Sequence, residues 1–140
     1  TLAKCCNPLP GDDVFGFITI HDGIKVHRTD CPQMVKAMAQ HGDRIIRAQW
    51  QSQRESAFLA ILKVKGTDRI GLVKDVTQVI SGDLQVNIKS LNIGLTDEGI
   101  FEGTIKVFVY DTKHLEMLRE ELMQVEGLVG TQRCDAAEEV

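Results

Sequence analysis

The second half of the chain constrains the fold most, because its apolar residues alternate between two different periods. Residues 67–82, and a segment that begins at Asp111-Thr112, repeat apolar side chains every three or four positions, which predicts two amphipathic helices. Apolar stretches that predict strands lie at 58–64, 86–95, 100–110 and 127–133. The order strand, helix, strand, strand, helix, strand is that of the ferredoxin-like fold. We therefore expect two helices on one face of a sheet whose other face or edge is open to a partner.

Local signals mark the ends of these two helices. Asp68 is expected to cap the first helix, and Gly82 is expected to end it. Asp111-Thr112 is expected to cap the second helix. The caps and the periodicity therefore predict the same two helices independently.

The first half predicts a smaller unit of a hairpin, a helix and a strand. Residues 14–28 predict a β-hairpin, because Asp22-Gly23 is a two-residue turn signal between apolar-rich stretches. The start and stop signals of a following helix are Thr29 or Asp30, Pro32 and Gly42. A short strand is expected within residues 44–50. A unit of this size has a thin core and often needs a stabilising element such as a metal ion.

A polar segment at 51–56 divides the α+β chain into two domains, expected at 1–52 and 53–134. The acidic residues 135–140 are expected to fray. The net charge of the chain is −4, and the excess of acidic residues lies in the second half. This charge argues against a general nucleic-acid-coating role. No signal peptide or bilayer-spanning run is recognisable, so we expect a cytosolic protein without a membrane partner.

Three of the four cysteines lie within the first 31 residues, and this clustering favours metal or redox chemistry. Zinc prefers thiolate and imidazole ligands, which are offered here by Cys5, Cys6, His27 and Cys31. The turn-forming stretch NPLPG can return the cysteine pair to the junction between the hairpin and the helix, where the other two residues lie. Cys134 lies apart from this group, near the acidic tail.

Two other interpretations of these cysteines stay open. They fit ordinary buried thiols beside a surface histidine, because adjacent cysteines do not usually point at one atom. They also fit a redox sensor that acts through thiol oxidation. Metal analysis would separate these interpretations from a zinc site.

Two further groups of residues are candidates for binding. Positive charges of the first half that could contact RNA, or that could be solvated surface charges, are Lys25, Arg28, Lys36, Arg44 and Arg47. In the segment GTDRIGLVKD (66–75), a strand ends and a helix begins, and free N–H groups at a helix start can hold an anion such as an amino acid. Alternatively, Gly71 packs the helix against the sheet and Asp68 is only a cap. Walker, GxSxG and HExxH motifs are absent from the sequence, so an autonomous active site is not expected.

The stretches LAKCCNPLPGDDVFGFIT and GIKVHRTDCP resemble the conserved-cysteine, zinc-finger-like (ribosome-intersubunit) domain of the RelA/SpoT-homologue family. The unit that follows is similar to the ACT domain of that family, and DRIGLVKDVTQVIS resembles its strand-to-helix passage. The resemblance covers residues 1–133 and implies a small cysteine domain followed by a ferredoxin-like ACT domain. The positions that match the first domain are Cys5, Cys6, His27, Asp30 and Cys31, with zinc as the implied metal.

The resemblance implies a function in regulation. Members of the family synthesise, and often hydrolyse, (p)ppGpp with catalytic domains that lie N-terminal to this region. The fragment is then no enzyme itself, but the C-terminal region through which a cytoplasmic GTP pyrophosphokinase senses starvation by contact with ribosomal RNA and tRNA.

Some members bind branched-chain amino acids at the ACT domain. The positions that this property implies here are Asp68, Arg69, Gly71 and Leu72. The alternative function is a homo-oligomerisation module that controls an enzyme through pairing of ACT domains.

Overall fold

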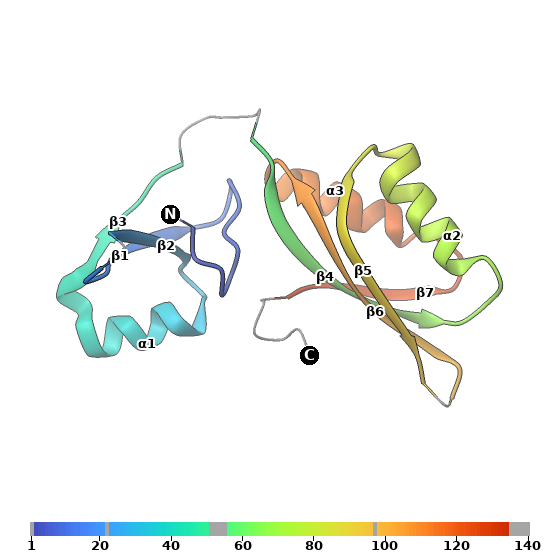
Figure 1. Cartoon of the computed structure of the whole chain (residues 1–140), viewed down its shortest axis with the longest axis horizontal. Helices are drawn as coiled ribbons and strands as arrows, with labels where there is room; N and C mark the ends of the chain where they lie inside the picture. The colour runs from blue at the N-terminus through green and yellow to red at the C-terminus, as the bar shows by residue number, and fades with distance from the viewer. Residues whose placement is uncertain (1, 22, 51–55, 97, 135–140) are drawn as a thin grey trace.

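The computed structural model describes residues 2–21, 23–50, 56–96 and 98–134. Asp22 of the predicted turn, residues 51–55 of the predicted boundary and the predicted tail 135–140 lie outside the described residues. The described residues form two α+β units that follow one another along the chain (Figure 1).

The first unit is a three-stranded antiparallel sheet with one helix packed against it. Its strands, in the spatial order β2-β1-β3, are β1 (Val14–Ile18), β2 (Ile24–Arg28) and β3 (Ile45–Arg47). Helix α1 (Pro32–His41) and the 3₁₀ turn η1 (Gly42–Arg44) connect β2 to β3. The antiparallel pairing of β1 with β2 confirms the predicted hairpin.

Two local predictions for this unit differ from the structure. The hairpin connection runs from residue 19 to residue 23, not through two residues, and the Thr19 N–H closes it by donating to the Gly23 carbonyl at 2.7 Å. Neither Thr29 nor Asp30 caps α1, because the backbone turns at this point and Cys31 donates its N–H to the Arg28 carbonyl. Cys31 is the residue that precedes α1, which begins at Pro32.

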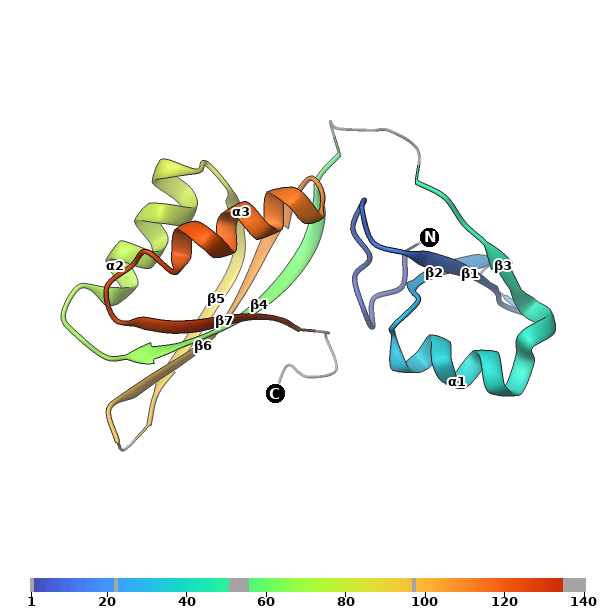
Figure 2. The same cartoon turned by 180° about the vertical axis from the view of Figure 1, so that it is seen from behind.

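The second unit is a four-stranded antiparallel sheet with helices on one face only (Figure 2). Its strands, in the spatial order β5-β6-β4-β7, are β4 (Phe58–Thr67), β5 (Asn87–Leu95), β6 (Ile100–Val109) and β7 (Leu128–Cys134). Its helices are α2 (Leu72–Thr77), the π-helical turn η2 (Gln78–Asp83) and α3 (Thr112–Leu122). This is the predicted ferredoxin-like order of elements.

The first helix of this unit is shorter than the predicted 67–82. Gly71 adopts a left-handed conformation with φ of 83°, so the helix begins only at Leu72 and Asp68 does not cap it. Its second half widens into η2, and Gly82 lies within this turn instead of ending an α-helix. The other predicted cap is confirmed, because the side chain of Asp111 accepts a hydrogen bond of 2.7 Å from the His114 N–H.

The main hydrophobic core lies between the second sheet and its helices, and it contains one residue of the first unit. Leu9, in the loop that follows the cysteine pair, has no exposed surface and belongs to this core. The ring of Trp50 packs edge to face against that of Phe58, the first residue of β4, with the ring centroids 5.6 Å apart. Side chains of the first unit therefore pack against the second unit. Among the helices of the described residues, none has the length and apolar character needed to span a membrane.

Candidate metal centre

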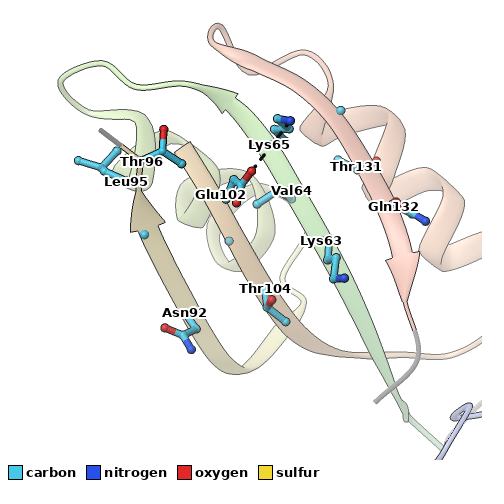
Figure 3. A pocket seen from close by; sticks show the side chains of 13 residues that line it. Lys63, Val64, Lys65, Asn92, Leu95, Thr96, Glu102, Thr104, Thr131 and Gln132 are labelled. Carbon is cyan, nitrogen blue, oxygen red and sulfur yellow. Dashed lines mark ion pairs between the residues drawn. The ribbon is translucent and has the colours of Figure 1, made fainter. Parts of the chain in front are cut away.

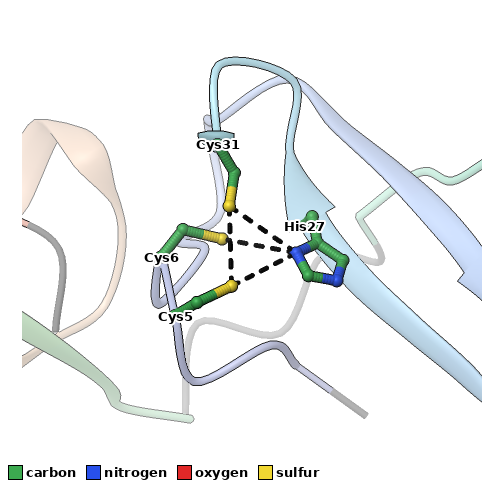
Figure 4. Close-up of side chains that lie close together, drawn as sticks. All are labelled: Cys5, Cys6, His27 and Cys31. Carbon is green, nitrogen blue, oxygen red and sulfur yellow. Dashed lines mark hydrogen bonds between the residues drawn. The ribbon is translucent and has the colours of Figure 1, made fainter. Parts of the chain in front are cut away.

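Four sulfur- and nitrogen-bearing side chains converge where the N-terminal segment runs beside β2 (Figure 4). Cys5 and Cys6 come from this segment, His27 from β2, and Cys31 from the residue before α1. The ligand atoms of all four lie within 4.8 Å of one another. The structure therefore brings together the four residues that were predicted as metal ligands.

The separations between these atoms fit a single small metal ion. Cys5 Sγ lies 3.4 Å from His27 Nδ1 and 3.5 Å from Cys31 Sγ. The same Nδ1 lies 4.0 Å from Cys6 Sγ and 3.7 Å from Cys31 Sγ. A tetrahedral zinc ion with Zn–S of about 2.3 Å and Zn–N of about 2.0–2.1 Å would separate its ligand atoms by roughly 3.5–3.8 Å. The donor set and its spacing thus suit zinc without large rearrangement.

Backbone pairing explains how neighbouring cysteines reach one point. Ala3 donates its N–H to the Val26 carbonyl, and Leu2 bridges to Val26, so the N-terminal segment is held along β2. Asn7 then donates its N–H to the Ala3 carbonyl and takes a positive φ of 45°. This tight turn curls the chain around the two cysteines. Adjacent side chains can therefore face the same centre although an extended backbone would point them apart.

Burial favours the neutral form of the groups in this cluster. Burial, and then the neighbouring Cys31, raises the pKa of Cys5 above its ordinary value. Burial also raises the pKa of Cys6, against the opposing effect of the Arg28 N–H, which donates to Cys6 Sγ at 3.4 Å. Burial and the charge of Lys25 lower the pKa of His27, so its imidazole is neutral and able to bind a metal. A metal ion would have to displace protons from the thiols.

The candidate RNA-contacting residues do not share one surface. Lys25 lies on the same face of the first sheet as His27 and Arg47, since alternate residues and cross-strand partners share a face. Arg28 lies on the opposite face, with a side chain only 12% exposed and 3.3 Å from the Asp30 carboxylate. Arg44 lies in η1, at the end of α1.

The candidate amino-acid-binding residues are already engaged within the second unit. Leu72 is buried in the core, and the Asp68 N–H donates to the Gly99 carbonyl at 3.1 Å. The Arg69 guanidinium donates to the Glu126 carbonyl at 2.6 Å and to the Asp75 carboxylate at 2.7 Å. Of the four candidates only Arg69 lines the adjacent hollow of about 360 Å³.

The open face of the second sheet carries a larger hollow of about 750 Å³ (Figure 3). Its walls are mostly polar or charged, and Lys65 lies 3.9 Å from Glu102 across it. Polar residues on the face away from the helices are typical of an antiparallel sheet that faces water. This surface contains no counterpart of the Cys/His cluster among the residues that the structure describes.

Sequence reasoning missed one group of residues beside the cluster. Asp12, which directly follows the turn-forming stretch NPLPG, accepts hydrogen bonds from Arg133 near the other end of the chain. Leu9, which was assigned no role, is a core residue of the second unit. Asp12 and Arg133 are 121 positions apart in the sequence, so no local pattern could pair them.

Family models describe both units of the chain. The model described as the RelA/SpoT RIS domain matches residues 1–51, and the model described as the ACT domain matches residues 54–133. The RIS match contains all four residues of the Cys/His cluster. The order of the two matches is the order of the two units in the structure.

Relatives match almost the whole chain. The GTP pyrophosphokinase of Streptomyces coelicolor is 35% identical over 97% of this chain and 16% of its own length. The bifunctional (p)ppGpp synthase/hydrolase RelA of Mycobacterium tuberculosis is 36% identical over 97% of this chain and 18% of its own length. The GTP pyrophosphokinase of Escherichia coli K12 is 29% identical over 94% of this chain, again 18% of its own length. The chain thus spans less than a fifth of these relatives.

Solved structures of ACT domains match the second unit. The crystal structure of the ACT domain from the GTP pyrophosphokinase of Chlorobium tepidum aligns with a TM-score of 0.50 and 31% identity. The alignment covers 56% of this chain and 99% of that domain. The fold of the second unit is therefore that of an ACT domain.

Proposed function

This chain belongs to the RelA/SpoT family, with a RIS domain followed by an ACT domain, and from this premise we propose that it is the C-terminal regulatory region of a (p)ppGpp synthetase/hydrolase. The observation that carries the proposal is the joint match of both domains, in order, to GTP pyrophosphokinases over 94–97% of the chain. In this proposal the domains divide near residue 52, and the catalytic domains of the parent cytoplasmic enzyme act in cis.

The regulatory role consists of sensing starvation through contact with the ribosome. Exposed cations of the first unit, such as Arg47, are candidates for contact with ribosomal RNA and tRNA. Contacts of this kind release counterions, so their affinity falls steeply as salt concentration rises. Co-sedimentation of the chain with ribosomes over a salt series tests this role. Absence of binding at low salt, together with no effect of amino acids on the chain, would leave the proposal without support.

The Cys/His cluster serves this function as a structural zinc site. Cys5, Cys6, His27 and Cys31 would hold the ion, which supplies folding free energy to a unit with a thin core. The convergence of three thiols and one imidazole, with Cys5 Sγ 3.4 Å from His27 Nδ1 and 3.5 Å from Cys31 Sγ, supports this assignment over buried thiols or a redox sensor. Metal analysis of protein purified under reducing conditions tests it.

The ACT domain adds a site for a branched-chain amino acid near the β4–α2 loop. Arg69 would contribute to this site because it lines the hollow beside α2. Its present hydrogen bonds to Glu126 and Asp75 would have to rearrange, as would the loop that holds Asp68 and Gly71. Calorimetric titration with leucine, isoleucine and valine tests for this ligand.

A second candidate function is homo-oligomerisation through the ACT domain. Two edge strands, β5 and β7, border its sheet, and Leu95 and Val129 on these strands are 61% and 68% exposed. Unpaired edges with apolar side chains favour pairing with another chain. Light scattering over a concentration series tests this function, and a strict monomer at high concentration would contradict it.

A further inference from the structure

The loop between Cys6 and Val14 has contacts at both ends, one with the Cys/His cluster and one with the ACT domain. Its residues lie between the two units (Figure 1). Arg133, at the end of β7, donates from Nη2 to the carbonyl of Asn7, which directly follows Cys6, at 3.0 Å. One ACT side chain therefore reaches the residue next to a proposed zinc ligand.

Further contacts fix the loop on the ACT domain. Arg133 donates two hydrogen bonds of 2.9 Å to the carboxylate of Asp12. The Thr112 N–H, at the start of α3, donates to the Pro10 carbonyl at 2.9 Å. Leu9 is fully buried in the ACT core. The loop is thus held by an apolar anchor, a main-chain hydrogen bond and a bidentate ion pair.

The loop is also rigid between these contacts and the cysteines. The Leu9 N–H donates to the Asp12 carboxylate at 2.7 Å, and the Asp12 N–H donates to the Leu9 carbonyl at 2.9 Å. Only two residues separate Cys6 from Leu9. A displacement of Leu9 or Asp12 from the ACT domain would therefore move Cys6.

We propose that docking of this loop on the ACT domain positions Cys5 and Cys6, so that the ACT domain sets the zinc affinity of the RIS domain. This inference rests on the zinc site of the proposed function. Some residues orient metal ligands from outside the coordination shell, and mutation of these residues commonly weakens metal affinity. Coupling of this kind is reciprocal, so zinc must in turn strengthen docking of the loop on the ACT domain. The loop then connects the metal centre and the ACT domain thermodynamically.

The test compares the zinc affinity of the whole chain and its variants by competition with a chromophoric chelator. Arg133→Gln and Asp12→Asn each remove the ion pair, and each is expected to weaken zinc affinity by about tenfold. Arg119→Gln is the matched control. Arg119 makes similar contacts, to Thr131 and Glu116, but within the ACT domain and away from the loop, so its variant should bind zinc like the parent chain.

A second measurement tests the reverse direction on the unaltered chain and does not depend on folding of the variants. Hydrogen exchange of the Thr112 amide, which donates to Pro10, should speed up when zinc is removed, whereas the amide of Leu118 in the middle of α3 should not. Equal zinc affinity of Arg133→Gln and the parent chain, or an unchanged Thr112 exchange rate, would overturn the coupling alone. If the parent chain binds no zinc, the proposed metal site fails and the coupling fails with it.

Discussion

The guanidinium of Arg133 donates two hydrogen bonds of 2.9 Å to the carboxylate of Asp12, although the two residues are 121 positions apart in the sequence. Both side chains are largely removed from water, at 17% and 11% exposed. Bidentate pairs of this kind are stronger and more directional than a single charged contact. The pair joins the last strand of the ACT domain to the loop that follows the cysteine pair, and thereby connects the two domains.

Removal of this pair should destabilise the chain. We expect Arg133→Gln to lower the free energy of unfolding by about 2–3 kcal/mol, because the Asp12 carboxylate would lose its charged partner while still largely buried. Urea titration monitored by the fluorescence of Trp50 would measure the loss. Trp50 is suited to this purpose because its indole N–H donates to the Asp12 carbonyl at 3.0 Å. A loss no larger than that of Arg119→Gln would contradict the prediction.

Leu9→Ala should destabilise the ACT domain although Leu9 precedes it by more than forty residues. The substitution leaves a cavity in the core, for which a loss of about 2–5 kcal/mol in the free energy of unfolding is expected. Ile70→Ala is the control, since Ile70 is completely exposed and its truncation should change stability by less than about 0.5 kcal/mol. Thermal unfolding of both variants provides the measurement. Equal midpoints would show that Leu9 does not pack in the core in solution.

Cys31→Ser should abolish stoichiometric zinc binding, because a neutral hydroxyl replaces one of four ligands at a closed structural site. Cys134→Ser provides the matched control. Cys134 is also buried, at the end of β7, but it lies outside the cluster, so its variant should retain zinc. Elemental analysis of both proteins, purified under reducing conditions, measures the difference. Zinc retained in Cys31→Ser would exclude the proposed ligand set.

Zinc affinity should fall as the pH is lowered. Burial raises the pKa of Cys5 and Cys6, so both thiols are protonated near neutral pH and must release protons when the metal binds. Each decrease in pH opposes that release, and protonation of His27 opposes binding further once the pH falls below its lowered pKa. Chelator competition at several pH values would reveal the trend. An affinity that does not vary with pH would indicate that thiolates are not the ligands.

The two helix starts of the ACT domain should respond differently to loss of an aspartate. Asp111→Ala removes a side chain that accepts a hydrogen bond from the His114 N–H, so a loss of about 1 kcal/mol in the free energy of unfolding is expected. Asp68→Ala should have a smaller effect, because the side chain of Asp68 does not cap α2. Urea titration of the two variants compares them. A larger loss in Asp68→Ala would show that it acts as the cap after all.

Much of the fold could be predicted because it depends on short-range patterns. The alternation of strand and helix periods in the second half is a consequence of which side chains face the core, and it identified the order of the ACT elements. The predicted start of α2 was wrong. Gly71 takes a left-handed conformation and directly precedes the helix, so Asp68 does not cap it. Asp68 instead donates its N–H to the Gly99 carbonyl, a contact with the β5–β6 connection that no local pattern indicates.

By itself the sequence determined the residue types of the Cys/His cluster, the two-domain order and the resemblance to the RelA/SpoT family. Only the tertiary structure decided that the four ligand atoms lie within 4.8 Å of one another, that the candidate cations divide between two faces, and that Leu9 and Asp12 contact the neighbouring domain. The physical reason is the range of the interactions. Helix and strand periods are local, whereas the bond between Arg133 and Asp12 forms only when the folded chain brings its two ends together.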